Sequence, residues 1–250
     1  MKVLLVSSGS GSRGGGEIFL LYLGEGLRAA GHEPVLWCPS HERMDELAGK
    51  FEAIGEVRRE AYDNSYLDRR LRVISALADR AGVRRLAESF AGFEGDLIHL
   101  NKQTVEDGLD LGAALDRSGK PWVSTVHITQ GNRELGAKLG GVRDALGEGA
   151  LRRQGREAPI AVSDTRRRTL EARLGREVAS VYNGVPEGPE AGREERRHEV
   201  LQRFSWDANV FLVVCVARLE PQKNPSRFLK LAAQLAKVSP QARFVWVGDG

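Results

Sequence analysis

The chain has 250 residues, of which 41% are hydrophobic and 28% are charged, a composition typical of globular proteins with one large or two ordinary domains. Lys and Arg number 37 against 34 Asp and Glu, which gives a net charge of +3. This charge is too small for an obligate nucleic-acid-binding protein of this length, so we expect no nucleic-acid partner.

The first apolar run, Lys2 to Ser8, predicts a strand and is too short for a secretory signal or a membrane span. Two cysteines, Cys38 and Cys215, lie inside apolar runs, as is typical of reduced core thiols rather than of a disulfide framework. We therefore expect a cytoplasmic protein.

A glycine-rich loop follows this strand, with five glycines between Gly9 and Gly16. Such a loop before a helix can bind a phosphate through its backbone amides, and the alternative is a simple turn. Gly9, Gly11 and Gly14 also match the dinucleotide pattern of a nicotinamide-dependent dehydrogenase. That alternative is disfavoured, because Cys38, Pro39 and Ser40 stand where it needs an acidic residue for the ribose.

Short apolar runs alternate with helical patterns along the first 185 residues, which predicts an α/β fold with a doubly wound parallel sheet. The predicted strands are Lys2 to Ser8, Pro34 to Cys38, a weaker one near Val57, Asp96 to Asn101, Trp122 to His127, Pro159 to Val162 and Val178 to Tyr182.

Two helices are predicted between these strands. Glu17 to Ala30 has apolar residues at helical spacing and ends before Gly31, a suitable left-handed cap. Leu67 to Phe90 places Leu71, Ile74, Leu77 and Ala78 on one face, and we expect this half-exposed helix to pack on the sheet.

Arginines cluster at 69, 70 and 72, at 152 and 153, and at 166 to 168. Solvated helix faces are the first interpretation of such runs. The alternative is peripheral contact with the acidic inner face of the membrane or with an anionic acceptor.

A loop with two prolines and two glycines, Pro186 to Gly192, predicts a linker between an N-terminal domain, residues 1–185, and a second domain, residues 186–250. The second domain begins a new sheet with strands Phe211 to Ala217 and Phe244 to Val247, joined by a helix from Pro225 to about Val238. Its 65 residues fall short of the roughly 100 of an ordinary doubly wound domain, so we expect it to be incomplete.

Two cations stand at the end of the second domain's first strand. Arg218 follows Phe211 to Ala217, and Lys223 precedes Asn224 and Pro225, a suitable cap and first residue for the next helix. Ligands of open α/β sheets bind outside the carboxyl ends of strands, and Arg with Lys there can stabilise a departing diphosphate without a metal. The alternative is a pair of ordinary surface charges.

Six segments occur in one order along the chain: Gly14-Gly15-Gly16-Glu17, Val123 to His127, Val162-Ser163, Asn183-Gly184-Val185, Arg218 to Lys223 and Val247 to Gly250. In this order they resemble the large retaining glycosyltransferase family 4, which has the GT-B fold of two facing Rossmann-like domains. Members carry a pair of glutamates shortly after the region of Gly248, which this sequence does not reach.

The resemblance implies that Arg218 and Lys223 hold the donor diphosphate, that Gly14, Gly15 and Gly16 border donor and acceptor, and that Gly248 lies beside the nucleotide. It implies that His127 faces the donor sugar, and the alternative is a structural histidine. Glu17 and Asn101 are expected on the acceptor side, although Asn101 alone equally suits a turn at a strand end.

The expected reaction is transfer of a sugar from a nucleoside diphosphate sugar, with retention, to a glycan, a lipid-linked acceptor or a small molecule. We expect no metal, because the sequence has no Asp-x-Asp and no His/Cys cluster with ligand spacing, and no cofactor. The alternatives are a GT-B sugar-nucleotide epimerase or hydrolase, and a non-catalytic relative that binds without turnover.

Overall fold

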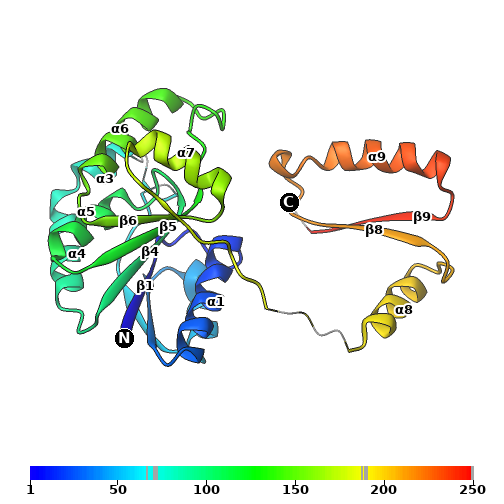
Figure 1. Cartoon of the computed structure of the whole chain (residues 1–250), viewed down its shortest axis with the longest axis horizontal. Coiled ribbons are helices and arrows are strands. Elements are labelled where there is room, and N and C mark those ends of the chain that lie inside the picture. The colour runs from blue at the N-terminus through cyan, green and yellow to red at the C-terminus, as the bar shows by residue number, and fades with distance from the viewer. Residues whose placement is uncertain (66, 70–72, 187, 189–190, 249–250) are drawn as a thin grey trace. The chain divides into compact units, whose positions relative to one another are not determined.

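Strands and helices alternate in the computed structural model, which describes residues 1–65, 67–69, 73–186, 188 and 191–248 (Figure 1). The contacts divide the chain into two units, Met1–Pro186 and Glu187–Gly250. Residues 187, 189 and 190 of the expected linker lie outside the described residues.

The sheet of the first unit is parallel throughout, in the order β3-β2-β1-β4-β5-β6-β7. Its strands are β1 (Lys2–Ser7), β2 (Glu33–Pro39), β3 (Glu56–Glu60), β4 (Leu97–Thr104), β5 (Trp122–Ile128), β6 (Glu157–Ala161) and β7 (Ala179–Ser180). The predicted last strand, Val178 to Tyr182, is therefore shorter than expected, because only two residues pair with β6.

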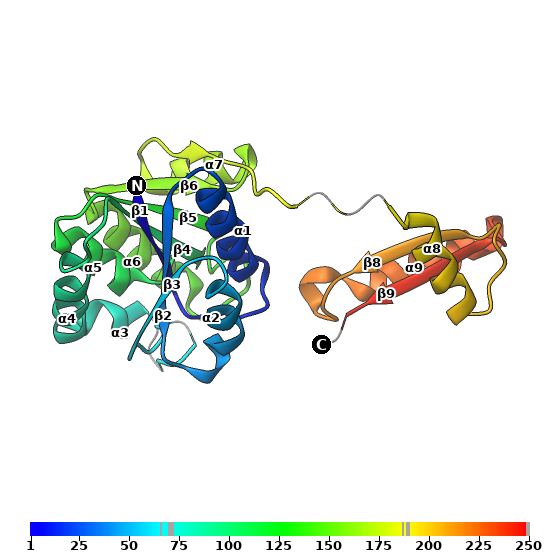
Figure 2. The ribbon, with the colours of Figure 1, turned by 90° about the horizontal axis from the view of Figure 1, so that it is seen from below.

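Helices cover both faces of this sheet. They are α1 (Gly15–Ala29), α2 (Asp45–Phe51) after the short 3-10 helix η1 (Glu42–Met44), α3 (Val73–Ala78), α4 (Arg80–Ala91), α5 (Leu109–Ser118), α6 (Gly140–Arg153) and α7 (Asp164–Leu174). Seen from below, α1 and α2 lie on one side of the strands and α4 and α5 on the other (Figure 2).

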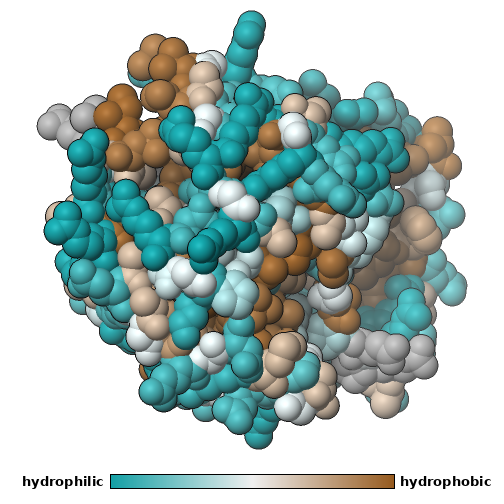
Figure 3. All heavy atoms as spheres, turned by 60° about the vertical axis from the view of Figure 1, so that its left-hand side comes forward, coloured by the Kyte–Doolittle hydropathy of each residue, from teal (hydrophilic) through white to brown (hydrophobic). Residues whose placement is uncertain are grey.

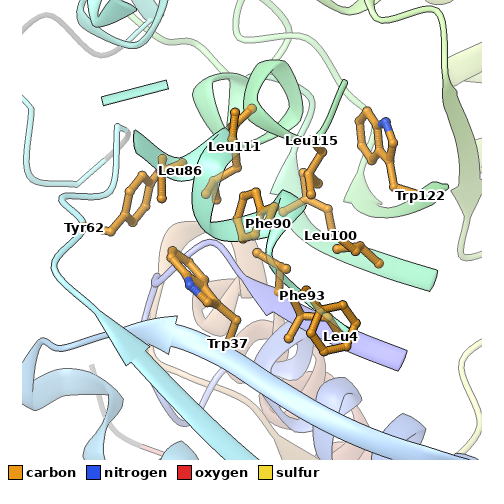
Figure 4. Packing of buried hydrophobic residues seen from close by; sticks show 14 of the residues in the cluster. Leu4, Trp37, Tyr62, Leu86, Phe90, Phe93, Leu100, Leu111, Leu115 and Trp122 are labelled. Atoms are coloured by element: carbon orange, nitrogen blue, oxygen red, sulfur yellow. The ribbon is translucent and has the colours of Figure 1, made fainter. Parts of the chain in front are cut away.

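The alternation of side chains along β1 explains the two cores. Val3 and Leu5 pack on the face of α1 and α2, whereas Leu4 and Val6 join the cluster beneath α4 and α5. A strand that is buried on both faces has a continuous apolar run in its sequence. This is why β1 could be predicted from the sequence. In the second cluster Trp37 meets the rings of Tyr62 and Phe90 edge to face (Figure 4).

The predicted helix Leu67 to Phe90 is wrong as a single element. The chain breaks at Asp79, whose carboxylate accepts a hydrogen bond from the backbone N–H of Gly82 and caps α4. Within α3, Val73 and Ala76 face the core, whereas Ile74, Leu77 and Ala78 of the predicted apolar face are exposed, so the predicted face is wrong. Leu71 lies outside the described residues.

The second unit holds two parallel strands, β8 (Phe211–Val216) and β9 (Ala242–Val247). α9 (Pro225–Val238) joins them, and its Phe228 packs edge to face on Trp246 and Phe244 of β9. α8 (Arg193–Arg203) precedes β8, where the sequence predicted only a strand after the linker. No helix among the described residues combines the length and the apolar character that crossing a bilayer requires.

Candidate functional site

The glycine-rich loop and the ends of β4 and β5 meet at one edge of the first sheet. Ser7 of β1 is paired in register with Asn101 of β4, and Asn101 with Thr125 of β5. The loop leaves β1 at this edge and His127 lies two residues beyond Thr125. The parallel topology thus brings together residues that are far apart in the sequence.

Asn101 links His127 to the start of α1. Its side-chain N–H donates to the carbonyl oxygen of Gly16 at 2.9 Å, and its Oδ1 lies 2.8 Å from Nε2 of His127. A carbonyl can only accept, so the Gly16 bond fixes the orientation of the amide and leaves Oδ1 facing the ring. His127 therefore donates from Nε2, and in the neutral ring Nδ1 is the acceptor.

Burial keeps two histidines neutral here. Desolvation lowers the pKa of His127 to about 4, and burial together with the nearby His127 lowers the pKa of His99 to about 4. Phe19 of α1 contacts both rings edge to face, with centroids 5.1 Å from His127 and 6.0 Å from His99. His99 also bonds to Oγ1 of Thr125 at 2.8 Å.

Glu17 is buried beside this link. Its Oε1 accepts hydrogen bonds from Ser10 of the loop and from Nε2 of Gln103, the latter at 3.0 Å. Sequence reasoning identified Glu17 but neither Ser10 nor Gln103. Gln103 lies two residues after Asn101 on the same face of β4, and this period-two spacing is the signal that could have found it.

The three glycines at the start of α1 differ in the space around their Cα atoms. A Cβ on Gly16 would collide with the Gln103 amide, and one on Gly14 would meet the Glu17 carboxylate, whereas Gly15 has open space. Gly14 precedes α1 without a side-chain cap. The first amides of the helix are therefore available to an anion.

Arg43 and Ser12 hold the base of the loop. Nε of Arg43 donates to the carbonyl oxygen of Gly9 at 2.8 Å, and its other nitrogens bind the carboxylate of Asp68. The Ser12 hydroxyl donates to the backbone carbonyl of Arg43. The loop is thus anchored at its first half, and the half next to α1 carries the glycines that face the site.

The second unit places Arg218 and Lys223 around a tight turn after β8. Arg218 is exposed and donates to Oε1 of Glu220 at 2.6 Å. Lys223 ends the short 3-10 helix η2 (Pro221–Lys223). Asn224 adopts a left-handed conformation with φ of 54°, and its side chain accepts from the N–H of Arg227 to cap α9, as predicted from its type.

Gly248 lies at the end of β9, against the end of β8. Its φ is 145°, and a Cβ there would overlap the carbonyl oxygen of Ala217. The same carbonyl accepts from Nε1 of Trp246 at 2.7 Å. Gly248 therefore lets the two strand ends approach next to Arg218. Asp249 and Gly250 of the motif lie outside the described residues.

Two other features of the first unit lie at the ends of β2 and β3. A cavity of about 690 Å³ is lined by residues of both charges, among them His41, Asp63 and Arg85. His41, Asp63 and Asp68 also bring potential metal ligands within 4.8 Å of one another, a group that sequence spacing did not reveal. The Asp68 carboxylate is already bound by Arg43, whose guanidinium lowers its pKa.

The arginine clusters are partly paired. Arg69 was expected in a solvated or membrane-facing run, yet it forms ion pairs with Asp79 and with the buried Asp110. Arg70 and Arg72 lie outside the described residues. Arg167 binds Glu171, and Arg152 binds Glu148. Arg69 is therefore a structural cation of the first unit.

Comparison with known proteins gives a family and a fold. The profile of Glycosyltransferase Family 4 matches residues 13–188. No curated protein matches the chain in sequence.

Among solved structures, the chain is similar to HepE of Anabaena, solved in complex with UDP and glucose. The TM-score is 0.65 at 18% identity, over 99% of this chain and 61% of that one. The lipopolysaccharide outer core galactosyltransferase WaaB gives 0.58 at 15% identity, over 100% of this chain and 61% of that one. UDP-GlcNAc 2-epimerase of Neisseria meningitidis, bound to UDP-GlcNAc, gives 0.58 at 11% identity, over 98% and 65%.

The chain thus spans about three fifths of the length of the first two of these proteins. At such identities the likeness concerns the fold, and it confirms the predicted α/β architecture of GT-B type.

Proposed function

Because the chain belongs to Glycosyltransferase Family 4, we propose that it takes part in transfer of a sugar from a nucleoside diphosphate sugar to an acceptor. The observation that carries the proposal is the link from the phosphate-binding type of loop at Gly16 through Asn101 to His127. This link joins a helix start without a side-chain cap, which would attract an anion, to a neutral histidine that could contact a sugar hydroxyl.

In the first unit, the free amides at Gly14 to Gly16 would bind negative charge of the donor or acceptor. The neutral His127 would accept a hydrogen bond from a hydroxyl through Nδ1, because Asn101 occupies Nε2. The Asn101 amide is buried and both its polar atoms are bonded inside the protein. We therefore propose that Asn101 acts on the acceptor side by positioning His127, and that Glu17 presents its carboxylate there.

In the second unit, Arg218 and Lys223 would hold the diphosphate. Departure of a nucleoside diphosphate leaves negative charge on its oxygens, and two cations at one turn would stabilise that charge in the transition state. To bind it, Arg218 would exchange its exposed partner Glu220 for a phosphate oxygen. Exposed ion pairs contribute only about 0–1 kcal/mol, so this exchange costs little.

These two cations would take the role that a divalent metal has elsewhere, and we propose a reaction with neither metal nor cofactor. We further propose retention of configuration, the outcome that the family resemblance implies. UDP and glucose in the HepE structure make UDP-glucose the first donor to test.

A sugar-nucleotide epimerase is the second candidate, because UDP-GlcNAc 2-epimerase has a similar fold. Both candidates bind a nucleoside diphosphate sugar, so binding alone does not separate them. The products do, because only a transferase links the sugar to a second molecule.

Isothermal titration of the full chain with UDP, GDP and their glucose conjugates tests the proposed donor site. We expect Arg218→Ala and Lys223→Ala each to weaken binding roughly tenfold or more, as for loss of a hydrogen bond to a charged group. Lys230→Ala on α9 removes an equal charge from an exposed position and should bind like wild type.

Titrations with Mg²⁺ and with a chelator should agree if no metal is needed. Equal binding by all three variants and wild type would contradict the assignment of Arg218 and Lys223. Binding only in the presence of the metal would contradict metal independence.

A further inference from the structure

A row of exposed apolar side chains runs from the loop after β5 into α6. Leu135, Leu139, Val142 and Leu146 are exposed by 48%, 77%, 57% and 38%. We call these four residues the apolar row. The row begins eight residues after His127, so it continues from the strand that carries the candidate site.

α6 packs Ala150 and Leu151 into the core but leaves other apolar residues exposed, and it turns several charged residues inward. Its charged residues Arg143, Asp144 and Glu148 face neighbouring elements, where Arg143 binds Glu106 and both carboxylates bind Arg173. Val142 and Leu146, four residues apart, lie together on the solvent side. A globular helix normally places these two kinds of residue the other way round.

The backbone of Leu139 has a left-handed conformation, which is unusual for a leucine. Leu139 has φ of 54° and is the residue before α6, so a leucine occupies a left-handed position that costs about 1–2 kcal/mol for an L-residue. It is also the most exposed member of the row. Its side chain makes no packing contribution to the core that would offset this cost.

Exposed cations flank the row. Arg133 and Lys138 lie on the same loop, and Arg153 lies seven residues after Leu146, on the same side of α6. Glu134 is the exposed acid of this segment, and its carboxylate accepts the N–H of Gly131. The rim is therefore basic, and the row contains aliphatic residues without the aromatic anchors that protein interfaces favour.

We propose that the apolar row docks on an anionic lipid bilayer, with its aliphatic side chains among the headgroups and Arg133, Lys138 and Arg153 against lipid phosphates. This proposal rests on the proposed function and adds the class of the acceptor. Docking through the segment that follows β5 would hold a lipid-linked acceptor at the edge of the sheet that carries His127. The membrane contact expected from Arg166 to Arg168 moves to this neighbouring surface, since Arg167 is paired with Glu171.

Flotation of the full chain with phosphatidylcholine vesicles, with and without phosphatidylglycerol, tests the proposal. Wild type should float with the anionic vesicles, and Leu139→Ser with Val142→Ser should lower its partition coefficient roughly tenfold or more, since each side chain loses buried apolar area. Arg133→Glu with Lys138→Glu should abolish the preference for anionic lipid.

Matched controls come from the second unit and from α7. Leu229→Ser with Val238→Ser removes two equally exposed apolar side chains and should not change flotation, nor should Arg166→Glu with Arg168→Glu. Circular dichroism checks that each variant is folded.

Three results would overturn the proposal: no flotation of wild type, equal loss in the second-unit control, or equal binding to neutral vesicles. A different result would assign the apolar row to a dimer interface with a second copy of this chain. In that case wild type would not bind vesicles but would sediment as a dimer, and the variants of the row would sediment as monomers. Titration with UDP-glucose separates the two proposals, because flotation without donor binding contradicts only the proposed function, and donor binding without flotation contradicts only the docking surface.

Discussion

At the scale of single residues, the candidate site of the first unit depends on groups that hold one another in place. Gln103 and Ser10 fix Glu17, Asn101 fixes His127, and the carbonyl of Gly16 fixes Asn101. Such supporting contacts keep reacting groups in position, and displacement of one group propagates to the others.

Gly16 and Gly15 provide a matched pair of substitutions at the start of α1. A methyl group at Gly16 would displace the Gln103 amide and break its bond to Glu17, whereas Gly15 has open space. We expect Gly16→Ala to be about 1 kcal/mol less stable to urea than Gly15→Ala, the value of one hydrogen bond. Gly16→Ala should also bind UDP-glucose more weakly, and equal stability and binding of the two variants would contradict this account.

The two histidines predict a dependence of stability on pH. Their pKa values fall from 6.5 to about 4 on folding, so the unfolded chain binds more protons between these values. The stabilisation is fully present above pH 6.5 and is lost as the pH falls toward 4, with buried His99 alone contributing on the order of 3 kcal/mol. Urea unfolding followed between pH 4 and 7 should show this decline.

A negatively charged neighbour would raise the pKa of His127, which burial lowers. In Asn101→Asp a carboxylate faces Nε2 and stabilises the imidazolium, so the pKa of His127 should rise from about 4 in an NMR titration. Thr125→Val alters only the hydrogen bond of His99 and serves as the control. An unchanged pKa of His127 in Asn101→Asp would show that the amide does not face the ring.

The sequence was sufficient to predict which residues stand at strand ends, because apolar runs and the parallel order give these positions directly. His127 was found in this way, and the glycines from the composition of the loop before a helix. Asn101 was expected at a strand end or in a turn, but β4 continues to Thr104, so Asn101 lies inside the strand. The bonds of Asn101 inside the protein, and the partners Ser10, Gln103 and Phe19, could not be predicted, because they depend on how α1 lies across β4 and β5.

At the scale of elements, Asp79 decides that the segment before α4 forms two helices. Its carboxylate caps α4 and also binds Arg69. We expect Asp79→Ala to lower the free energy of unfolding by about 1 kcal/mol through loss of the cap. Asp79→Asn keeps the acceptor oxygen and should retain most of this stability in urea unfolding, so equal losses in both variants would assign the effect to the ion pair.

Apolar strands were predicted well, and the helices of charged composition were not. β1, β2, β4 and β5 read as continuous apolar runs because they are buried on both faces. α6, α7 and α8 lack an apolar stripe, since α6 buries ion pairs and shows Val142 and Leu146 outside. Ala150, Leu151, Leu170 and Leu174 do pack in the core, but so few apolar positions give only a weak helical period in the sequence.

At the scale of the whole molecule, the groups proposed for the reaction are divided between the two units. The first carries the seven-stranded parallel sheet and the groups proposed for the sugar and the acceptor, and the second carries the cations proposed for the diphosphate. The fold class followed from the alternation of strands and helices. The donor and acceptor did not, since strand ends and glycines alone do not encode their chemistry.

Product analysis distinguishes sugar transfer with retention from the alternative reactions in one experiment. The full chain is incubated with UDP-glucose labelled with ¹³C at C1, together with membrane lipid extract as the acceptor, and the anomeric signals are followed by NMR. We expect release of UDP in step with a new glycoside that keeps the anomeric configuration of the donor, and we expect both to be reduced in Arg218→Ala. Conversion of the sugar nucleotide to an epimer, or a glycoside of inverted configuration, would contradict this expectation.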